Sequence, residues 1–128
     1  MDLANVLIVD DDPRNLRLLG DVLRFHGFTV RTCDTGESAC SEVSGGYRPA
    51  VVLMDIHMPG MGGVAAIGAL KALPDMSRAR FVAMTASVMP HQLASLQAAG
   101  IDGFHAKPVD IAALLAQIRD WTRADPGA

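Results

Sequence analysis

Five short apolar runs alternate along the chain with longer amphipathic stretches, and this alternation restricts the fold more than any other feature. The run at residues 50–54 is wholly apolar, which is typical of a strand that is covered on both faces. Strands that alternate with helices in this way favour a parallel sheet with helices on both sides. We therefore predict an α/β fold, a doubly wound (βα)5 unit with a five-stranded parallel sheet.

Residues that start or stop regular structure set the expected boundaries. Pro13 suits the first turn of a helix that Asp12 caps, and Gly27 is a typical helix stop. The expected strands are residues 5–9, 28–33, 50–54, 80–84 and 103–106. The expected helices run from 13 to about 27, over 36–43, from the end of the 58–63 loop to about 73, over 90–99, and from Pro108 to about 122. We assign residues 1–122 to one domain and residues 123–128 to a flexible C-terminal tail.

Length and charge exclude several classes of protein. A chain of 128 residues forms one domain around a single core. The net charge is -3 and no run of lysine or arginine is present, so binding to nucleic acid or to an anionic membrane has no electrostatic support. No apolar stretch is long enough to span a membrane and there is no signal peptide, so we expect a cytoplasmic protein. Cys33 and Cys40 lack the spacing of a redox or metal motif and are interpreted as small thiols.

Charged and polar side chains follow four of the predicted strands. Asp10 and Asp11 come directly after the first strand, Asp55 after the third, Thr85 after the fourth and Lys107 after the fifth. Because ligands of open α/β sheets bind outside the carboxyl ends of the strands, we expect these side chains to share one crevice. Crowded carboxylates repel one another unless a cation relieves the repulsion, and their oxygens suit Mg²⁺. The pattern therefore indicates a magnesium-dependent phosphoryl-transfer site.

Each residue at this edge has a role in such chemistry. A carboxylate can be a nucleophile toward phosphorus, and Asp55 has no base beside it in the sequence. Lys107 can neutralise charge on the transferring group. We expect a helix to start at Pro108, and a lysine just before it would be unfavourable because its charge opposes the positive end of the helix dipole. This placement favours a functional role for Lys107. Thr85 can donate to a phosphate oxygen, whereas Asp12 is left out of the site as a helix cap.

The segments that carry these residues resemble the receiver domain of two-component response regulators. The resemblance rests on VLIVDDDP at residues 6–13, LMDIHMPGMGG at 53–63, MTA at 84–86 and KP at 107–108, and it extends to about residue 122. It implies a flavodoxin-like fold. The Lys-Pro pair and the glycine-rich loop look most like single-domain regulators of the polar-differentiation type, or like receivers attached to hybrid kinases.

The resemblance implies a phosphoacceptor and a metal site. Asp55 would accept a phosphoryl group from a phosphohistidine on a histidine kinase or a histidine phosphotransfer protein. Asp11 and Asp55, with the backbone carbonyl of His57, would bind Mg²⁺, and Asp10 would help through water.

The resemblance also implies a conformational switch. Lys107 would contact the phosphoryl group, and Thr85 would move toward it. Phe104 occupies the aromatic switch position, which is often tyrosine in this family. Phenylalanine keeps the aromatic ring but lacks the hydroxyl. His57 and Ser87 occupy variable positions that influence the lifetime of the phosphate.

We expect output through protein–protein contact or through other domains that are absent from this chain, without nucleic acid or membrane. The expected surface is the face formed by residues 90–99, residues 103–106 and the last helix. No DNA-binding segment follows the last helix, and Met1 with the short tail favours a stand-alone regulator.

Three other functions fit parts of the sequence. A phosphatase of the haloacid dehalogenase type would also form an aspartyl phosphate, but such enzymes usually have a second acid where this chain has His57. So short a chain also has no cap domain, so we expect a switch that assists its own phosphorylation and dephosphorylation, not an enzyme. A flavodoxin-like electron carrier is disfavoured because the acids after the first strand would repel a flavin phosphate. A degenerate receiver that only binds partners is disfavoured by the complete five-residue set.

Overall fold

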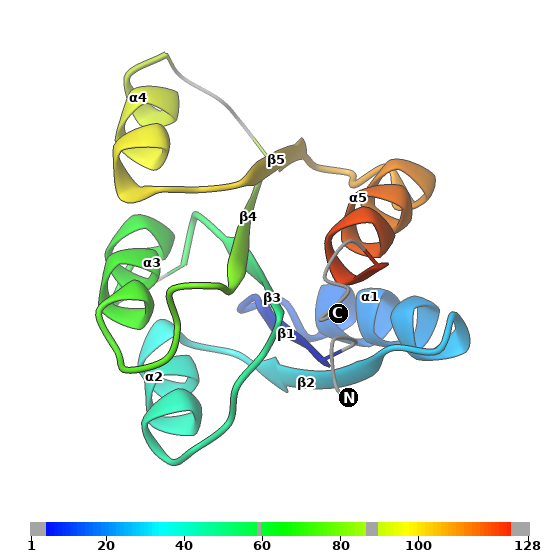
Figure 1. Ribbon diagram of the computed structural model, residues 1–128. Coiled ribbons are helices and arrows are strands. Elements are labelled where there is room, and N and C mark those ends of the chain that lie inside the picture. The colour runs from blue at the N-terminus through cyan, green and yellow to red at the C-terminus, as the bar shows by residue number, and fades with distance from the viewer. Residues whose placement is uncertain (1–4, 59, 87–89, 124–128) are drawn as a thin grey trace.

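Five parallel strands form one sheet in the order β2-β1-β3-β4-β5 (Figure 1). The structure is a computed structural model that describes residues 5–58, 60–86 and 90–123. The strands are β1 (Asn5–Val9), β2 (Thr29–Cys33), β3 (Val51–Asp55), β4 (Arg80–Thr85) and β5 (Gly103–Ala106). The helices are α1 (Pro13–Phe25), α2 (Gly36–Ser44), α3 (Gly63–Lys71), α4 (Pro90–Ala99) and α5 (Ile111–Arg123). The predicted doubly wound, flavodoxin-like fold is confirmed.

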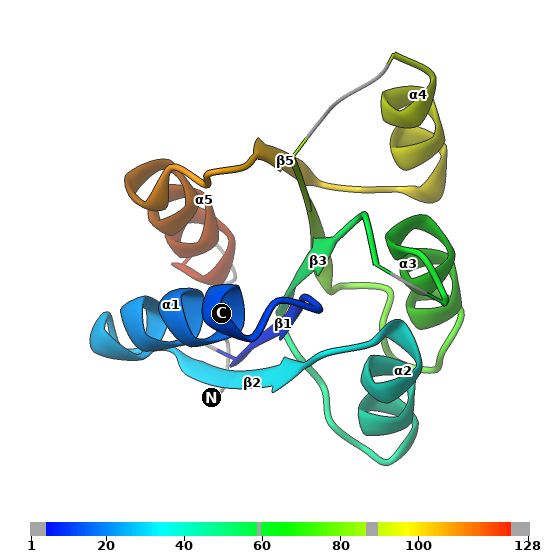
Figure 2. The same cartoon turned by 180° about the vertical axis from the view of Figure 1, so that it is seen from behind.

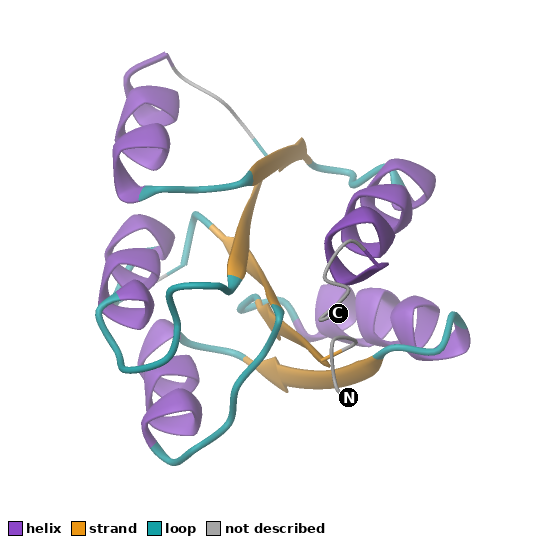
Figure 3. Ribbon diagram, viewed as in Figure 1, coloured by secondary structure: helices purple, strands orange, loops and turns teal. Residues whose placement is uncertain are grey.

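The helices cover both faces of the sheet, as Figures 2 and 3 show from opposite sides. Helices α1 and α5 lie on one face and α2, α3 and α4 on the other. Side chains alternate along β1, so that Leu7 and Val9 join the core under α2–α4 while Val6 and Ile8 join the core under α1 and α5. All five residues of β3 are buried, which is why its sequence is continuously apolar up to Asp55.

The start of α1 follows its sequence signals closely. The Asp12 carboxylate accepts a hydrogen bond from the Arg14 backbone N–H at 2.9 Å, and this bond lowers the pKa of Asp12. Asp12 is thus the predicted N-cap, and Pro13 is the first helical residue. Helix α1 ends at Phe25, and Gly27 adopts a φ of 94° just beyond it, a left-handed conformation that favours glycine.

The start of the last helix differs from the prediction. Pro108 is expected from the sequence to open it, but α5 begins at Ile111. Asp110 is a good N-cap residue, and its carboxylate accepts a hydrogen bond from the Ala113 backbone N–H at 3.1 Å. Helix α5 extends through Arg123, and the remainder of the predicted tail, residues 124–128, lies outside the described residues.

A glycine allows α3 to begin directly against the end of β3. A Cβ on Gly63 would lie 2.6 Å from both the Asp55 carbonyl oxygen and the Ile56 Cα, a separation that real Cβ atoms do not tolerate. The Gly63 N–H also donates to the Ile56 carbonyl at 3.2 Å. The backbone on the carboxyl side of Asp55 is therefore held in place by contacts that only glycine permits. Within the described part of the chain, no helix is long and apolar enough to cross a membrane.

Candidate functional site

The carboxyl ends of β1, β3, β4 and β5 bring the predicted site residues to one edge of the sheet. Asp10 directly follows β1 and is fully buried, while Asp55 and Thr85 are the last residues of β3 and β4 and are also buried. In the register of the sheet, Asp55 pairs with Met84, and Thr85 pairs with Ala106. The strands therefore present these residues at nearly the same level, as the sequence predicts.

Backbone hydrogen bonds continue the sheet for one step past the strand ends. The Asp10 N–H donates to the Cys33 carbonyl at 3.1 Å, and the Lys107 N–H donates to the Thr85 carbonyl at 2.7 Å. These bonds fix the backbone at the first residue beyond β1 and at the first residue beyond β5. A rigid strand end orients a functional side chain more closely than a free loop does.

Three carboxylates converge at this edge. Asp10, Asp11 and Asp55 each offer an oxygen, and these oxygens all lie within 4.8 Å of one another. Asp10 and Asp55 are buried, whereas Asp11 is exposed and opens the cluster to solvent. Hard oxygen donors at this spacing form an acidic pocket that could hold a metal ion.

The buried Asp10 carboxylate is held from several sides. Its Oδ1 accepts from the Asp12 backbone N–H at 2.9 Å, and its Oδ2 accepts from the Asn15 side-chain amide at 3.0 Å. Sequence reasoning did not find Asn15. The available signal is weak, since it consists of one polar side chain in the first turn of α1, five residues after Asp10.

Lys107 is the cation of the cluster. Its Nζ lies 3.1 Å from Asp10 Oδ2 and 3.3 Å from Asp55 Oδ1. The side chain is 20% exposed, so the ammonium sits at the mouth of the site and bridges the two buried acids. Three acids thus face one base, and the cluster is short of positive charge.

Burial and neighbouring charges perturb the protonation of this pair. Burial, followed by the charge of Asp10, raises the pKa of Asp55, although Lys107 and the His57 backbone N–H at 3.3 Å act in the opposite direction. For Lys107, burial alone would lower the pKa, but Asp10 and Asp55 together outweigh burial and raise it. Lys107 therefore stays cationic at neutral pH, and Asp55 is a more basic carboxylate than an exposed aspartate.

The predicted switch residues lie on the neighbouring strands. Phe104 pairs with Ala83 in the sheet, is half-buried, and packs against the core under α2–α4. His57 is exposed next to Asp55. Their predicted roles in switching and in metal binding stay predictions. Ser87, predicted to influence phosphate lifetime, lies outside the described residues.

Lys107 does not lie at the start of a helix, in contrast to the prediction. A lysine beside Pro108 is expected to oppose a helix dipole only if the helix starts there, but α5 begins at Ile111. The dipole of α5 therefore does not act directly on Lys107. Lys107 directly follows β5, as predicted, and this position places its ammonium within 3.1 Å of Asp10 and 3.3 Å of Asp55.

A cleft of about 370 Å³ borders the site between α1 and the segment that leads into α5. The lining of the cleft is mostly apolar and includes Leu18, Pro108, Val109 and Ile111. Asn15 and Lys107 also line the cleft, and they connect it to the acidic cluster. Leu18 is 57% exposed, so the cleft presents a large apolar side chain to solvent beside the charged site.

Comparison with known proteins places this arrangement in a family. The family model described as response regulator receiver domain matches residues 6–119. The signal transduction histidine-protein kinase BarA of Escherichia coli K12 is 36% identical over 106 residues, which are 82% of this chain and 11% of that kinase. The sensor protein GacS of Pseudomonas syringae is 36% identical over 120 residues, which are 91% of this chain and 13% of GacS. The chain thus spans only about an eighth or less of these relatives' length.

A solved structure gives the same assignment. The signal receiver domain of a histidine kinase from Syntrophus aciditrophicus superposes with a TM-score of 0.88 at 25% identity, covering 98% of this chain and 94% of that one. The sheet order, the acidic pocket and these similarities agree with one another. The chain belongs to the response regulator receiver family of two-component systems.

Proposed function

We propose that Asp55 is the phosphoacceptor and takes a phosphoryl group from a phosphohistidine on a partner kinase or phosphotransfer protein. The observation that carries this proposal is the position of the Asp55 carboxylate. It lies at the carboxyl edge of the sheet, with its Oδ1 3.3 Å from the Lys107 ammonium and with the oxygens of Asp10 and Asp11 within 4.8 Å. A nucleophile, a fixed cation and a metal-binding pocket are the parts that phosphoryl transfer to a carboxylate requires.

The residues present fit Mg²⁺. Three carboxylates share one ammonium, two of the acids are buried, and oxygen is the donor that this ion prefers. Asp11 and Asp55 would hold the ion with the His57 backbone carbonyl, and Asp10 would assist through water. When bound, Mg²⁺ reduces the repulsion between the attacking carboxylate and the incoming phosphoryl group.

The transfer itself exchanges one bond to phosphorus for another. An Asp55 carboxylate oxygen forms the new O–P bond, while the N–P bond of the donor phosphohistidine breaks and the imidazole nitrogen keeps the bonding electron pair. Burial and the charge of Asp10 raise the pKa of Asp55, which makes its carboxylate a better nucleophile. Lys107, held as a cation by Asp10 and Asp55, stabilises charge on the phosphoryl oxygens.

Phosphorylation would then act as a conformational switch. The added charge and acceptor oxygens bind Thr85 and Lys107 better in one loop arrangement than in the other. Inverting a 1:99 population needs about 5.5 kcal/mol of differential interaction, and a few charge-assisted hydrogen bonds approach that value. Thr85 would move toward the phosphoryl group and Phe104 would repack, which alters the face built from α4, β5 and α5 that we propose for downstream protein contact.

On this proposal the chain is a switch, not an enzyme that turns over free phosphate esters. It assists only its own phosphorylation and dephosphorylation. The expectation of a cytoplasmic location stays a prediction.

Chemical labelling tests the proposal without a partner protein. A small phosphodonor such as acetyl phosphate should add one phosphoryl group to the chain in the presence of Mg²⁺, because the donor reaches Asp55 directly. Intact-protein mass spectrometry measures the product. Excess chelator should reduce labelling to background, and labelling that persists at the same rate in chelator would contradict the metal role.

We further propose that the apolar cleft beside Lys107 contacts an apolar surface of the donor protein next to its phosphohistidine, because the cleft borders the phosphoacceptor site. Leu18 is the large exposed hydrophobic side chain of its lining. A buried charge there would oppose docking, so Leu18→Asp should slow transfer from a phosphorylated phosphotransfer protein by about tenfold or more. Labelling by acetyl phosphate should change much less, since that donor needs no docking surface.

Phe25→Asp is the matched control for Leu18→Asp. Phe25 lies on the same helix and is 85% exposed, but it does not line the cleft. It should leave both rates near the wild-type values. Equal effects of the two substitutions on protein-to-protein transfer would refute the docking surface.

A further inference from the structure

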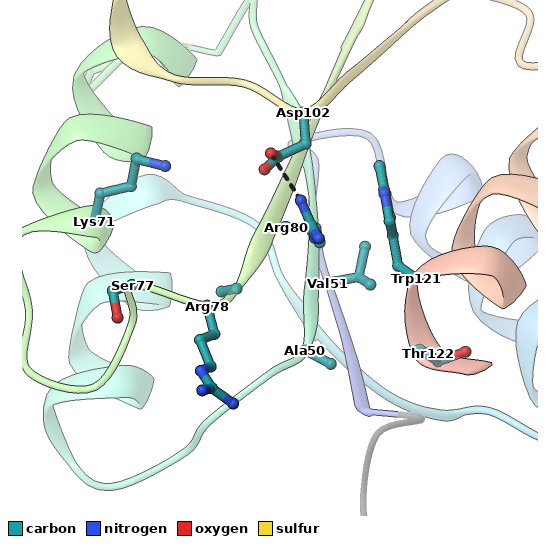
Figure 4. A pocket seen from close by; sticks show the side chains of 10 residues that line it. Ala50, Val51, Lys71, Ser77, Arg78, Arg80, Asp102, Trp121 and Thr122 are labelled. Carbon is teal, nitrogen blue, oxygen red and sulfur yellow. Dashed lines mark hydrogen bonds and ion pairs between the residues drawn. The ribbon is translucent and has the colours of Figure 1, made fainter. Parts of the chain in front are cut away.

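A second pocket lies at the opposite edge of the sheet, where β3 and β4 begin. Its volume is about 440 Å³, which falls in the range of small-molecule sites. Arg80 opens β4, Lys71 ends α3, and Trp121 lies near the end of α5, so the pocket joins both helical layers across the strand ends (Figure 4). Nothing in the phosphoacceptor mechanism uses it.

Positive charge gathers in this pocket although the whole chain carries a net charge of -3. Lys71, Arg78 and Arg80 line it, and Asp102 is the acid among its lining residues. Asp102 is already engaged by the backbone, because its Oδ2 accepts from the Phe81 N–H at 2.9 Å. Its other oxygen lies 3.5 Å from the Arg80 guanidinium, a long and weak contact.

The three cations retain donors for a ligand. The Lys71 ammonium donates to the Gly100 carbonyl at 3.1 Å and also lies 5.0 Å from the centroid of the Phe81 ring, so at most two of its three N–H groups remain for a ligand. The Arg80 side chain is half-exposed and has the one long contact to Asp102. Arg78 is exposed and has no hydrogen bond or ion pair to any residue that the structure describes. Such donors match a phosphate or carboxylate group.

An indole forms the apolar wall of the same pocket. Trp121 is half-buried, and the Arg80 guanidinium lies 5.8 Å from its ring centroid. Figure 4 shows the ring standing beside Arg80, on the side of the pocket opposite Lys71. A planar ring can pack on an indole, and an anionic group on the same molecule can reach the cations on the other side.

We propose that this pocket binds a small anionic ligand that combines a planar ring with a phosphate or carboxylate, of about the size of a mononucleotide. The pocket supplies charge complementarity, an aromatic wall and a suitable volume together. The proposal goes beyond the phosphoacceptor function and does not depend on it.

Trp121 is the one tryptophan of the chain, so intrinsic tryptophan fluorescence monitors this pocket without an added label. Titration with adenosine monophosphate in chelator, which keeps the ligand from bridging to the acidic pocket through a divalent ion, should give a saturable change in indole fluorescence. Calorimetry under the same conditions measures the affinity independently of the fluorophore. Adenosine and inorganic phosphate should each bind at least about tenfold more weakly, because each supplies only half of the contacts.

Matched variants separate the site from general charge effects. Arg78→Gln should weaken binding about tenfold. Because Arg78 is exposed and makes no hydrogen bond or ion pair to a described residue, its substitution should leave the fold intact. Arg17→Gln removes the same charge from an exposed position on α1 outside the pocket and should bind like wild type. The proposal is overturned by the absence of saturable binding, by equal affinities of Arg78→Gln and wild type, or by phosphate alone binding as tightly as the nucleotide.

Discussion

Replacing Asp55 by asparagine should abolish labelling by acetyl phosphate and at the same time stabilise the protein. An amide has no carboxylate oxygen to form the O–P bond, so labelling falls to background. The substitution would also remove one of the two buried acids that repel each other, while Lys107 would keep its partner Asp10 at 3.1 Å. We expect the free energy of unfolding to rise by about 0.5–2 kcal/mol, the range typical of a single stabilising substitution.

The pH dependence of this gain follows from the raised pKa of Asp55. The ordinary value is 3.8, and burial raises the pKa in the folded state. Above the folded pKa the carboxylate is ionised in both states and the full cost of its burial is present. As pH falls toward 3.8, the folded state takes up the proton first and that cost disappears. The stability advantage of Asp55→Asn over wild type, measured by urea unfolding, should therefore shrink as the pH falls. Labelling of the Asp55→Asn protein at the wild-type rate would refute the assignment of Asp55 as the phosphoacceptor.

Replacing Lys107 by alanine should have the opposite effect on stability and a large effect on rate. Asp10 and Asp55 would remain buried without their cation, which should destabilise the fold by about 1–3 kcal/mol. Loss of a fixed cation that stabilises the transferring group should slow labelling by about 100-fold. Added Mg²⁺ should stabilise Lys107→Ala more than wild type, because the ion then relieves a larger excess of negative charge.

Arg17→Ala is a suitable control for Lys107→Ala. Arg17 is exposed on α1, so its loss should change the free energy of unfolding by less than about 0.5 kcal/mol and leave the labelling rate near that of wild type. Urea unfolding with and without Mg²⁺, paired with labelling rates, measures both effects. A Lys107→Ala protein that is labelled as fast as Arg17→Ala would remove Lys107 from the mechanism.

The prediction was most accurate where an apolar run ends directly at a charged or polar residue. The continuous apolar run before Asp55 predicts a strand buried on both faces, and parallel topology then brings its end beside Asp10, as the structure shows. Strand boundaries agree to within one residue. Chain topology alone therefore placed the acids and the ammonium together, without any knowledge of distances.

Single residues that fit more than one structural role predicted helix starts and site residues less reliably. Proline fits the first turn of a helix, but Pro108 precedes the cap residue Asp110 and the helix starts later. Asn15 was missed because an amide in a helix is ordinary in sequence, and only the folded geometry shows that it donates to Asp10 at 3.0 Å. The pocket around Trp121 likewise joins residues from separate elements and leaves no sequence motif.

Phosphotransfer from protein-bound phosphohistidine tests the central claim most directly. Radiolabelled histidine kinases and phosphotransfer proteins from the same genome would each be mixed with the chain and sampled at short times, with Mg²⁺ or with chelator. For a matching donor, the label should leave the donor and appear on the peptide that contains Asp55, only when Mg²⁺ is present. Label that stays on every donor, or that appears on a residue other than Asp55, would contradict the account.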